Sequence, residues 1–193
     1  TEAWRHCRTG HDLLADFAPL AAMAEPILHH HTPWSRLQEE DIPSELALRA
    51  NLILLTDRVD AMAAAFHADK TVLAHADRIR DQIKSHSETY FAPELVEHFL
   101  DASRTEAFWL RLEPRAADTY LKAELSDSRH QPLDLEDLRK LSLIFSRIVD
   151  AKSPFTAEHS QGVSRVAQLL GRLAGLDCET CALLEIAGLL HDL

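Results

Sequence analysis

A histidine and a later His-Asp pair are the first residues whose types suit chemistry on a phosphate. His159 is followed, after the apolar run LLEIAGLL, by the adjacent residues His191 and Asp192. Consecutive helical residues point about 100° apart, so this imidazole and carboxylate can hold one ion or reach two. Mixed nitrogen and oxygen ligands suit iron or manganese, and paired ions can activate a bridging water for attack on phosphorus. An ordinary helix end would explain the common dipeptide HD equally well, but the apolar run and the earlier His159 favour a metal site.

A second set of chemically capable residues lies in the first third of the chain. It comprises His6, the run His29–His31, and Asp57 within the apolar stretch LILLTDRVDAM. A carboxylate in such a stretch is costly unless it is paired or bound to an ion. A solvated helix end would also explain the three histidines, and an ion pair with Arg49 or Arg58 would explain Asp57. We therefore regard the set as candidate metal ligands with these alternatives open.

The composition limits the class of partner and the compartment. The net charge of −11 argues against a binder of nucleic acid polymers, because such proteins need a basic face. Cys178 and Cys181 form a lone CxxC without the second pair of a zinc site, and with Cys7 they indicate ordinary thiols in a reducing compartment. The sequence shows no run of 18 apolar residues and no signal peptide at its start, so we expect a cytoplasmic protein without a membrane span.

Hydrophobic periodicity predicts an all-α fold, because no segment shows the period-two alternation of a strand. The polar stretch 32–43 is predicted to be a loop bracketed by prolines. SPFT, at 153–156, is predicted to cap a helix. Helices are expected over 11–31, 44–66, 69–84, 93–103, about 115–124, 134–151, 159–176 and 179–190.

Two stretches of the sequence resemble the two halves of an HD-GYP domain, a family of metal-dependent phosphohydrolases in the HD superfamily. FTAEHSQGVSRVAQLLGRLAGL and the later LLEIAGLLHDL resemble the opening half, with a metal-binding His and then HD at the end of an apolar helix. HCRTGHDLL, ILHHHTPW, EEDIPSELALRANLILLTDRVDAM and YFAPELVEHFL resemble the closing half. The resemblance implies a helical bundle of the HD/HD-GYP type.

The resemblance also implies a set of metal ligands drawn from both halves. Matched residue by residue, the ligand positions are His159, His191, Asp192, His6, His30, His31 and Asp57. His191 and Asp192 would be the catalytic residues, and Asp192 would bridge two ions. The His pair could instead be His29 and His30; we prefer the later register because Trp34 then falls where the family often has an aromatic residue.

Several features depart from the family pattern. The segment between Trp34 and Ile42 is short and lacks Gly-Tyr-Pro, and Gly162 stands where an Arg often follows HS. The sequence reaches HDL without the Gly-Lys that usually follows. Phe155 occupies a place where some members have an additional Glu ligand, which favours two ions over three.

The two halves also occur in the reverse of the family's order. We assign 1–112 to a degenerate closing half, 113–134 to a linker and 135–193 to an opening half that ends at the HD motif. Either the chain is a window of a tandem protein, holding the end of one copy and the start of the next, or it is a permuted domain, or a swap between chains, that assembles one site. The tandem arrangement is the preferred interpretation, although drift in a degenerate copy would tend to erase His6, the His run and Asp57.

By resemblance, the expected function is hydrolysis of a cyclic dinucleotide, cyclic di-GMP, in bacterial signalling. Two divalent ions, iron or manganese, would polarise the phosphate and generate hydroxide for in-line attack. Sensory or response-regulator domains, or a second copy in a homodimer, are the expected partners. A catalytically inactive signalling or interaction module is the alternative, supported by the missing Gly-Tyr-Pro, and an enzyme acting on another nucleotide is a third.

Overall fold

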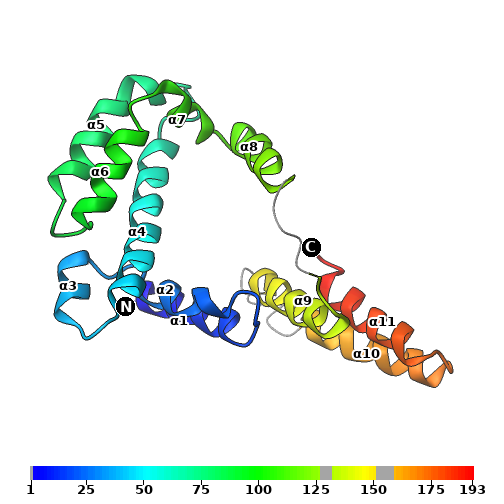
Figure 1. Ribbon diagram of the computed structural model, residues 1–193. Helices are drawn as coiled ribbons and strands as arrows, with labels where there is room; N and C mark the ends of the chain where they lie inside the picture. The colour runs from blue at the N-terminus through cyan, green and yellow to red at the C-terminus, as the bar shows by residue number, and fades with distance from the viewer. Residues whose placement is uncertain (1, 127–131, 151–158) are drawn as a thin grey trace. The chain divides into compact units, whose positions relative to one another are not determined.

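A computed structural model describes residues 2–126, 132–150 and 159–193 of the chain (Figure 1). Within these ranges the predicted all-α fold is confirmed, because the structure contains helices and one isolated bridge between Ser87 and Phe91 but no strand. The predicted cap at 153–156 and the position of Phe155 lie outside the described residues. The elements are α1 (Glu2–Ala15), η1 (Ala21–Met23), α2 (Ala24–His29), α3 (Trp34–Glu39), α4 (Ser44–Ala64), α5 (Val72–Ser85), α6 (Pro93–Ala102), α7 (Glu106–Arg111), α8 (Pro114–Ser126), α9 (Leu135–Asp150), α10 (His159–Leu173) and α11 (Cys178–Leu190).

The chain divides into two compact units. Unit 1 comprises Thr1–Ala15 and Leu20–Arg129, and unit 2 comprises Asp16–Pro19 and His130–Leu193. The segment 113–134, which we predicted to be a linker, contains α8, and α8 belongs to unit 1. The boundary between the units falls near the end of that segment.

The long helix α4 organises unit 1. It contacts α2 and α3 as well as α5, and α5 in turn contacts α6 and α7 (Figure 1). The main core lies where α4, α5, α6 and α7 meet, and Trp109 of α7 is buried there, with its indole N–H donating to the carbonyl of Ser103 at 2.9 Å. The other buried members of this core are Leu54, Leu55, Val59, Ala63, Val72, Ile79, Ile83, Phe91, Val96 and Phe99.

A buried asparagine fastens α4 to the segment before α6. The Asn51 side chain is fully buried, its amide donates to the carbonyl of Tyr90 at 2.8 Å, and its oxygen accepts from the N–H of Ala92 at 2.8 Å. The N–H of Trp34 also donates to the Tyr90 carbonyl, at 3.1 Å. Buried polar groups must be paired. The Asn51 side chain therefore fixes the position of the segment around Tyr90 and Ala92 relative to α4.

Unit 2 is built from α9, α10 and α11, and small residues bring these helices close. The buried residues of α9 include Ser142 and Ser146 rather than large side chains. In α11, a Cβ added to Gly188 would lie 2.5 Å from the Ser164 Cα of α10, so only glycine allows this approach. The Asp177 carboxylate caps α11 by accepting from the N–H of Thr180 at 2.8 Å.

Some predicted helix boundaries were wrong, each for a physical reason. The expected helix over 11–31 is interrupted after Ala15, because Pro19 lacks an N–H and its ring clashes with the carbonyl four residues earlier. The predicted loop over 32–43 contains α3, whose Leu37 packs with Ala47 and Ala50 of α4. Helix α7 was not predicted at all, since its six residues are held by burial of Trp109 rather than by a periodic pattern.

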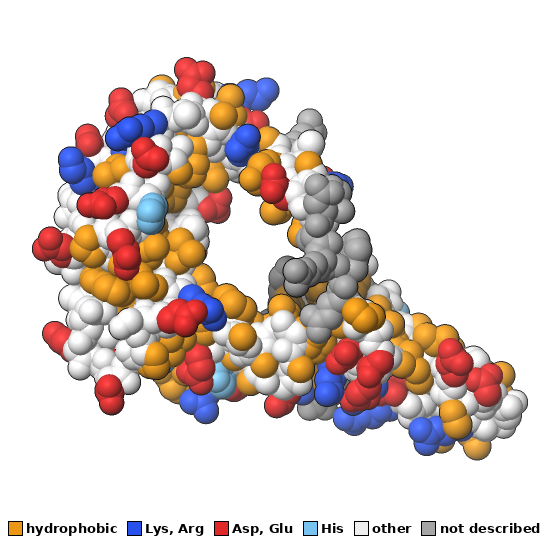
Figure 2. Space-filling view, viewed as in Figure 1, with side chains coloured by type: hydrophobic (Ala, Val, Ile, Leu, Met, Phe, Trp, Pro, Cys, Tyr) orange, Lys and Arg blue, Asp and Glu red, His pale blue; other side chains and the backbone are white. Residues whose placement is uncertain are grey.

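The surface of unit 2 carries many apolar side chains. Figure 2 shows hydrophobic side chains among acidic and basic ones over the part of unit 2 formed by α10 and α11. The exposed large hydrophobic residues of these two helices are Val166, Leu169, Leu170, Leu173 and Leu183. None of the helices over the described ranges combines the length and apolar character needed to cross a bilayer.

Two candidate metal-binding clusters

Three histidines converge in unit 1. His6 comes from α1, and His30 and His31 directly follow α2. One ring nitrogen from each lies within 4.8 Å of the others, which is the spacing of a group that can share an ion. The ring centroids of His30 and His31 are 4.0 Å apart, and that of His6 lies 5.3 Å from His30 and 5.8 Å from His31.

The approach of α1 to α2 creates this cluster. A Cβ added to Gly10 of α1 would lie 2.6 Å from Cγ2 of Ile27 in α2, so glycine permits close packing one turn beyond His6. The Nδ1 of His30 lies 2.5 Å from the carbonyl oxygen of Ile27, which orients the ring. When Nδ1–H donates to that carbonyl, the Nε2 lone pair is left for an ion, as in many metal-bound histidines.

Burial also prepares His31 for metal binding. It lowers the pKa of His31, and the nearby His30, Arg58 and His6 lower the pKa further, whereas Asp57 raises it. A lowered pKa keeps the imidazole neutral through neutral pH, which is the form that binds metals.

Asp57 is near this cluster but not within it among the described residues. It is exposed on α4, and its carboxylate accepts from the Arg58 guanidinium at 2.6 Å. The sequence left an ion pair with Arg58 open as an alternative to metal binding, and the structure contains that ion pair. Its negative charge raises the pKa of His31.

The structure separates the three consecutive histidines. The Nε2 of His29 lies 4.0 Å from the Glu25 carboxylate on the exposed side of α2. His30 and His31 instead face His6. His30 and His31 are therefore the two histidines of the run that lie close to His6, and their role as metal ligands stays a prediction.

A second cluster lies in unit 2, where the N-terminus of α10 meets the C-terminus of α11. The Nε2 atoms of His159 and His191 are 3.2 Å apart, and Oδ2 of Asp192 lies 3.5 Å from His159 Nε2 and 3.1 Å from His191 Nε2. Ligand atoms about 2.1 Å from one ion and at right angles to each other are about 3 Å apart. The three donor atoms are thus already spaced as neighbours around a single ion.

Gly188 has two effects on this cluster. Its carbonyl lies 2.9 Å from Nδ1 of His191, so it can accept the Nδ1–H and direct Nε2 toward His159. Its missing side chain allows α11 to touch the backbone of α10 at Ser164. All three donor residues are exposed, so an anionic ligand could reach an ion held here.

Sequence reasoning missed two buried residues beside His159. Ser160, the next residue, donates from its hydroxyl to Oδ1 of Asp150 at 2.9 Å, and both side chains are buried. This bond ties the start of α10 to the end of α9 and fixes the position from which His159 projects. The periodic pattern of α9 gave no signal for it, although an acidic residue at the end of an apolar helix stretch was visible.

The donors of both clusters fit a divalent transition metal. Imidazole nitrogen with or without carboxylate oxygen suits iron, manganese or zinc better than calcium or magnesium. Of the seven predicted ligands, the structure groups His6 with His30 and His31, and His159 with His191 and Asp192, while Asp57 belongs to neither group within the described residues.

The chain is similar to two curated phosphodiesterases of Vibrio cholerae. It is 32% identical to 3'3'-cGAMP-specific phosphodiesterase 1 over 194 residues, which cover 98% of this chain and 45% of that protein. It is 29% identical to 3'3'-cGAMP-specific phosphodiesterase 3 over 146 residues, covering 75% of this chain and 31% of that protein. The chain thus spans less than half the length of the curated relatives it matches. No protein-family model matches it.

A solved structure shares the fold. The crystal structure of the V. cholerae cyclic GMP-AMP specific phosphodiesterase V-cGAP3 matches with a TM-score of 0.66 and 25% identity. The match covers 96% of this chain and 44% of that chain. The all-helical arrangement of the chain is therefore similar to that of part of this solved structure.

Proposed function

We propose that this chain is part of a metal-dependent phosphodiesterase that hydrolyses a cyclic dinucleotide. The observation that carries the proposal is the convergence of His159, His191 and Asp192, with their donor atoms 3.1 to 3.5 Å apart. The similarity to phosphodiesterases over nearly the whole chain supports it.

The substrate to test first is 3'3'-cGAMP. We expected cyclic di-GMP from the sequence, but both curated relatives are named for 3'3'-cGAMP, and neither name mentions cyclic di-GMP. The two dinucleotides share the phosphodiester ring and differ in one purine. The specificity question therefore concerns base recognition, and cyclic di-GMP is the second substrate to assay.

The residues of this chain would hold and orient two divalent ions, either iron or manganese. A bound divalent ion lowers the pKa of a coordinated water and offsets phosphate charge. His159 and His191 would bind through Nε2, the Gly188 carbonyl would keep the His191 ring in place, and the Asp192 carboxylate would ligate or bridge. His6, His30, His31 and Asp57 would form the second group of ligands.

The order of the two HD-GYP-like stretches favours the tandem arrangement, which we include in the proposal. The alignment with the first relative runs through both stretches in the order they have here, and that relative is more than twice as long. Each cluster would then take its remaining ligands from another copy of the domain.

One observation favours a non-catalytic module instead. The segment in which the resemblance places Gly-Tyr-Pro is occupied by α3, which packs on α4 through Leu37. With α3 in this position, the chain would lack the Gly-Tyr-Pro loop of the family but would keep the helical fold. An HD enzyme acting on another nucleotide is the remaining possibility.

Metal analysis with phosphodiesterase assays separates these functions. The full-length protein, purified aerobically and anaerobically, should contain iron or manganese and hydrolyse both bis(p-nitrophenyl) phosphate and 3'3'-cGAMP. His191→Ala and Asp192→Ala should each abolish turnover while leaving helicity unchanged. His29→Ala, whose side chain faces Glu25, is the matched control and should retain activity.

Two results would overturn the proposal. Protein that remains free of metal in both preparations and inert toward both substrates would favour the non-catalytic module. Unchanged turnover in His191→Ala would show that the unit 2 cluster is not the reaction site.

A further inference from the structure

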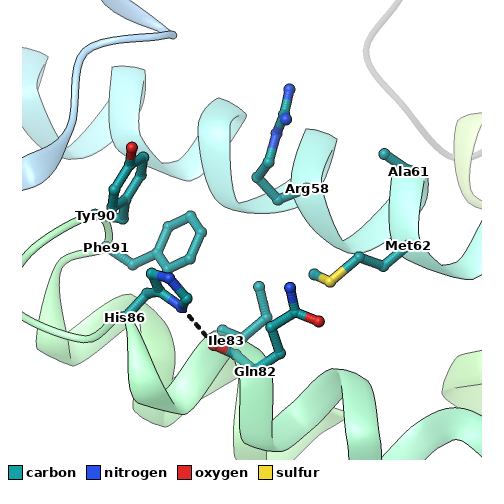
Figure 3. Close-up of a pocket in the computed structure, with 8 residues that line it drawn as sticks. All are labelled: Arg58, Ala61, Met62, Gln82, Ile83, His86, Tyr90 and Phe91. Atoms are coloured by element: carbon teal, nitrogen blue, oxygen red, sulfur yellow. Dashed lines mark hydrogen bonds between the residues drawn. The ribbon is translucent and has the colours of Figure 1, made fainter.

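A cavity in unit 1 lies between α4 and α5, and its lining includes none of the residues of the His6–His30–His31 cluster. It has a volume of about 340 Å³, within the range of pockets that bind small molecules. Figure 3 shows Met62 of α4 directed toward Gln82 and Ile83 of α5, with the aromatic side chains gathered at one end and Arg58 extending from α4 on the side away from α5. Its lining residues are Arg58, Ala61, Met62, Gln82, Ile83, His86, Tyr90 and Phe91.

The cavity combines an apolar floor with aromatic and polar groups at its rim. Ile83 and Phe91 are buried and close the bottom, while the Tyr90 side chain is 49% exposed. The rings of His86 and Tyr90 meet edge to face, with centroids 5.6 Å apart. Such exposed ring faces stack on nucleobases, and the amide of Gln82 offers both a donor and an acceptor to a base edge.

The rim is held in a fixed conformation. The Tyr90 carbonyl accepts from both the Asn51 amide and the Trp34 N–H, and Asn51 also binds the N–H of Ala92. The Nδ1 of His86 lies 2.8 Å from the Gln82 carbonyl, so this ring is oriented too (dashed line in Figure 3). The rim side chains are therefore already ordered before a ligand binds, so binding would cost little additional conformational entropy.

Arg58 is the cationic residue of the cavity lining. Its guanidinium also donates to the Asp57 carboxylate, at 2.6 and 2.9 Å, so a bound phosphate would share or replace this ion pair. In a chain with a net charge of −11, this guanidinium is the cation that the cavity offers to an anion. Guanidinium groups bind phosphate through two parallel hydrogen bonds.

We propose that this cavity binds one purine nucleotide unit, with the base stacked on the Tyr90 ring, its edge facing Gln82, and its phosphate held by Arg58 at the rim. The inference rests on the proposed function only in taking the ligand to be part of a cyclic dinucleotide. It assigns base recognition, which separates 3'3'-cGAMP from cyclic di-GMP, to residues outside both clusters.

The two methionines of the chain allow a direct test. Met62 lines the cavity, whereas Met23 lies on η1 and does not. In full-length protein with methyl-labelled methionine and a chelator present, GMP, AMP and 3'3'-cGAMP should each shift the Met62 signal and leave the Met23 signal in place. Inorganic phosphate alone should not move Met62. No shift at Met62 with any nucleotide, or equal shifts at both methionines, would overturn the inference.

Substitutions at the rim separate stacking from charge. Tyr90→Ala should weaken nucleotide binding about tenfold or more, and Tyr90→Phe should restore it, because stacking needs the ring and not the hydroxyl. Tyr120→Ala, which removes the other tyrosine from exposed α8, is the matched control and should bind normally. Arg58→Met should weaken binding of GMP but not of guanosine; equal weakening of both would contradict the phosphate contact.

The test also distinguishes failure of this inference from failure of the proposed function. Hydrolysis of bis(p-nitrophenyl) phosphate without any nucleotide shift at Met62 would leave the phosphodiesterase standing and remove the base site. A specific shift at Met62 in a protein that hydrolyses neither substrate would keep the base site and favour the non-catalytic module.

Discussion

At the scale of single residues, the direction of each imidazole decides which histidines can share an ion. His30 and His31 face His6, whereas His29 faces Glu25 on the exposed side of α2. Carbonyl oxygens of Ile27 and Gly188 hold one ring in each cluster so that its Nε2 is available. These backbone contacts are as much a part of the candidate sites as the ligands themselves.

Replacing one histidine at a time tests this division of the run. We expect His31→Ala to weaken Mn²⁺ binding by unit 1 about tenfold or more, because removing a ligand costs at least as much as removing its support. His29→Ala, the adjacent control, should leave the affinity unchanged. Isothermal titration of the chelator-treated protein with Mn²⁺ measures both. A loss in His29→Ala with unchanged affinity in His31→Ala would favour the His29–His30 register.

The cap of α11 predicts a pH dependence of stability. The N–H and hydroxyl of Thr180 bind the Asp177 carboxylate and hold its pKa below 3.8. The pKa of Asp177 is lower in the folded state than in the unfolded state. The ionised cap therefore contributes fully to stability above the unfolded-state pKa, and this contribution is lost as the pH falls through the folded-state pKa. In urea unfolding, the wild-type protein should have a higher free energy of unfolding than Asp177→Ala near neutral pH. This difference should shrink below about pH 4. A difference that stays constant into acid would refute the ionic part of this cap.

At the scale of elements, glycines set how closely paired helices approach at both clusters. Gly10 brings α1 against Ile27 of α2, and Gly188 brings α11 against the α10 backbone at Ser164. In each pair a histidine lies one turn or less from the glycine, so helix separation would move ligand atoms apart. Asp150 and Ser160 serve a related purpose by joining α9 to the start of α10.

Two glycines of unit 2 make a matched pair for testing close approach. Gly188→Ala places a Cβ 2.5 Å from Ser164 Cα and should lower stability by ~1–3 kcal/mol, the usual cost of overpacking. Gly162→Ala in α10 meets nothing within 4 Å and should raise stability by ~0.5–1 kcal/mol, because alanine is the better helix former. Chemical unfolding measures both, and metal content should fall only in Gly188→Ala. Similar effects of the two changes would show that helix contact does not depend on Gly188.

At the scale of the whole molecule, bound ions would link the stability of each unit to metal concentration. An ion that binds only the folded state stabilises it by about 2.7 kcal/mol at a concentration one hundred times its dissociation constant. A chelator should therefore lower the Tm of the metal-loaded protein. In the double variant His31→Ala/His191→Ala, which loses a ligand from each cluster, the chelator should have little effect. An equal drop in Tm for both proteins would place the stabilising ion outside these clusters.

The sequence by itself determined the helical class and the residues most able to bind metal. Periodic apolar positions predicted α4, α5, α6, α9, α10 and α11 closely, because long amphipathic helices encode their own period. The HD pair after an apolar run and the His-rich segment were visible for the same local reason. The charge of −11 predicts that the chain does not bind nucleic acid polymers, and this stays a prediction.

Only the tertiary structure decided which candidates meet and what supports them. It separated His29 from His30 and His31, placed Asp57 in solvent beside Arg58, and revealed the Asn51 and Asp150–Ser160 bonds. It also formed α3 and α7, whose short lengths leave no periodic signal and whose stability comes from burying Leu37 and Trp109. Such contacts join residues distant in sequence, and no local pattern specifies their partners, because burial and hydrogen bonding are settled only when the helices pack.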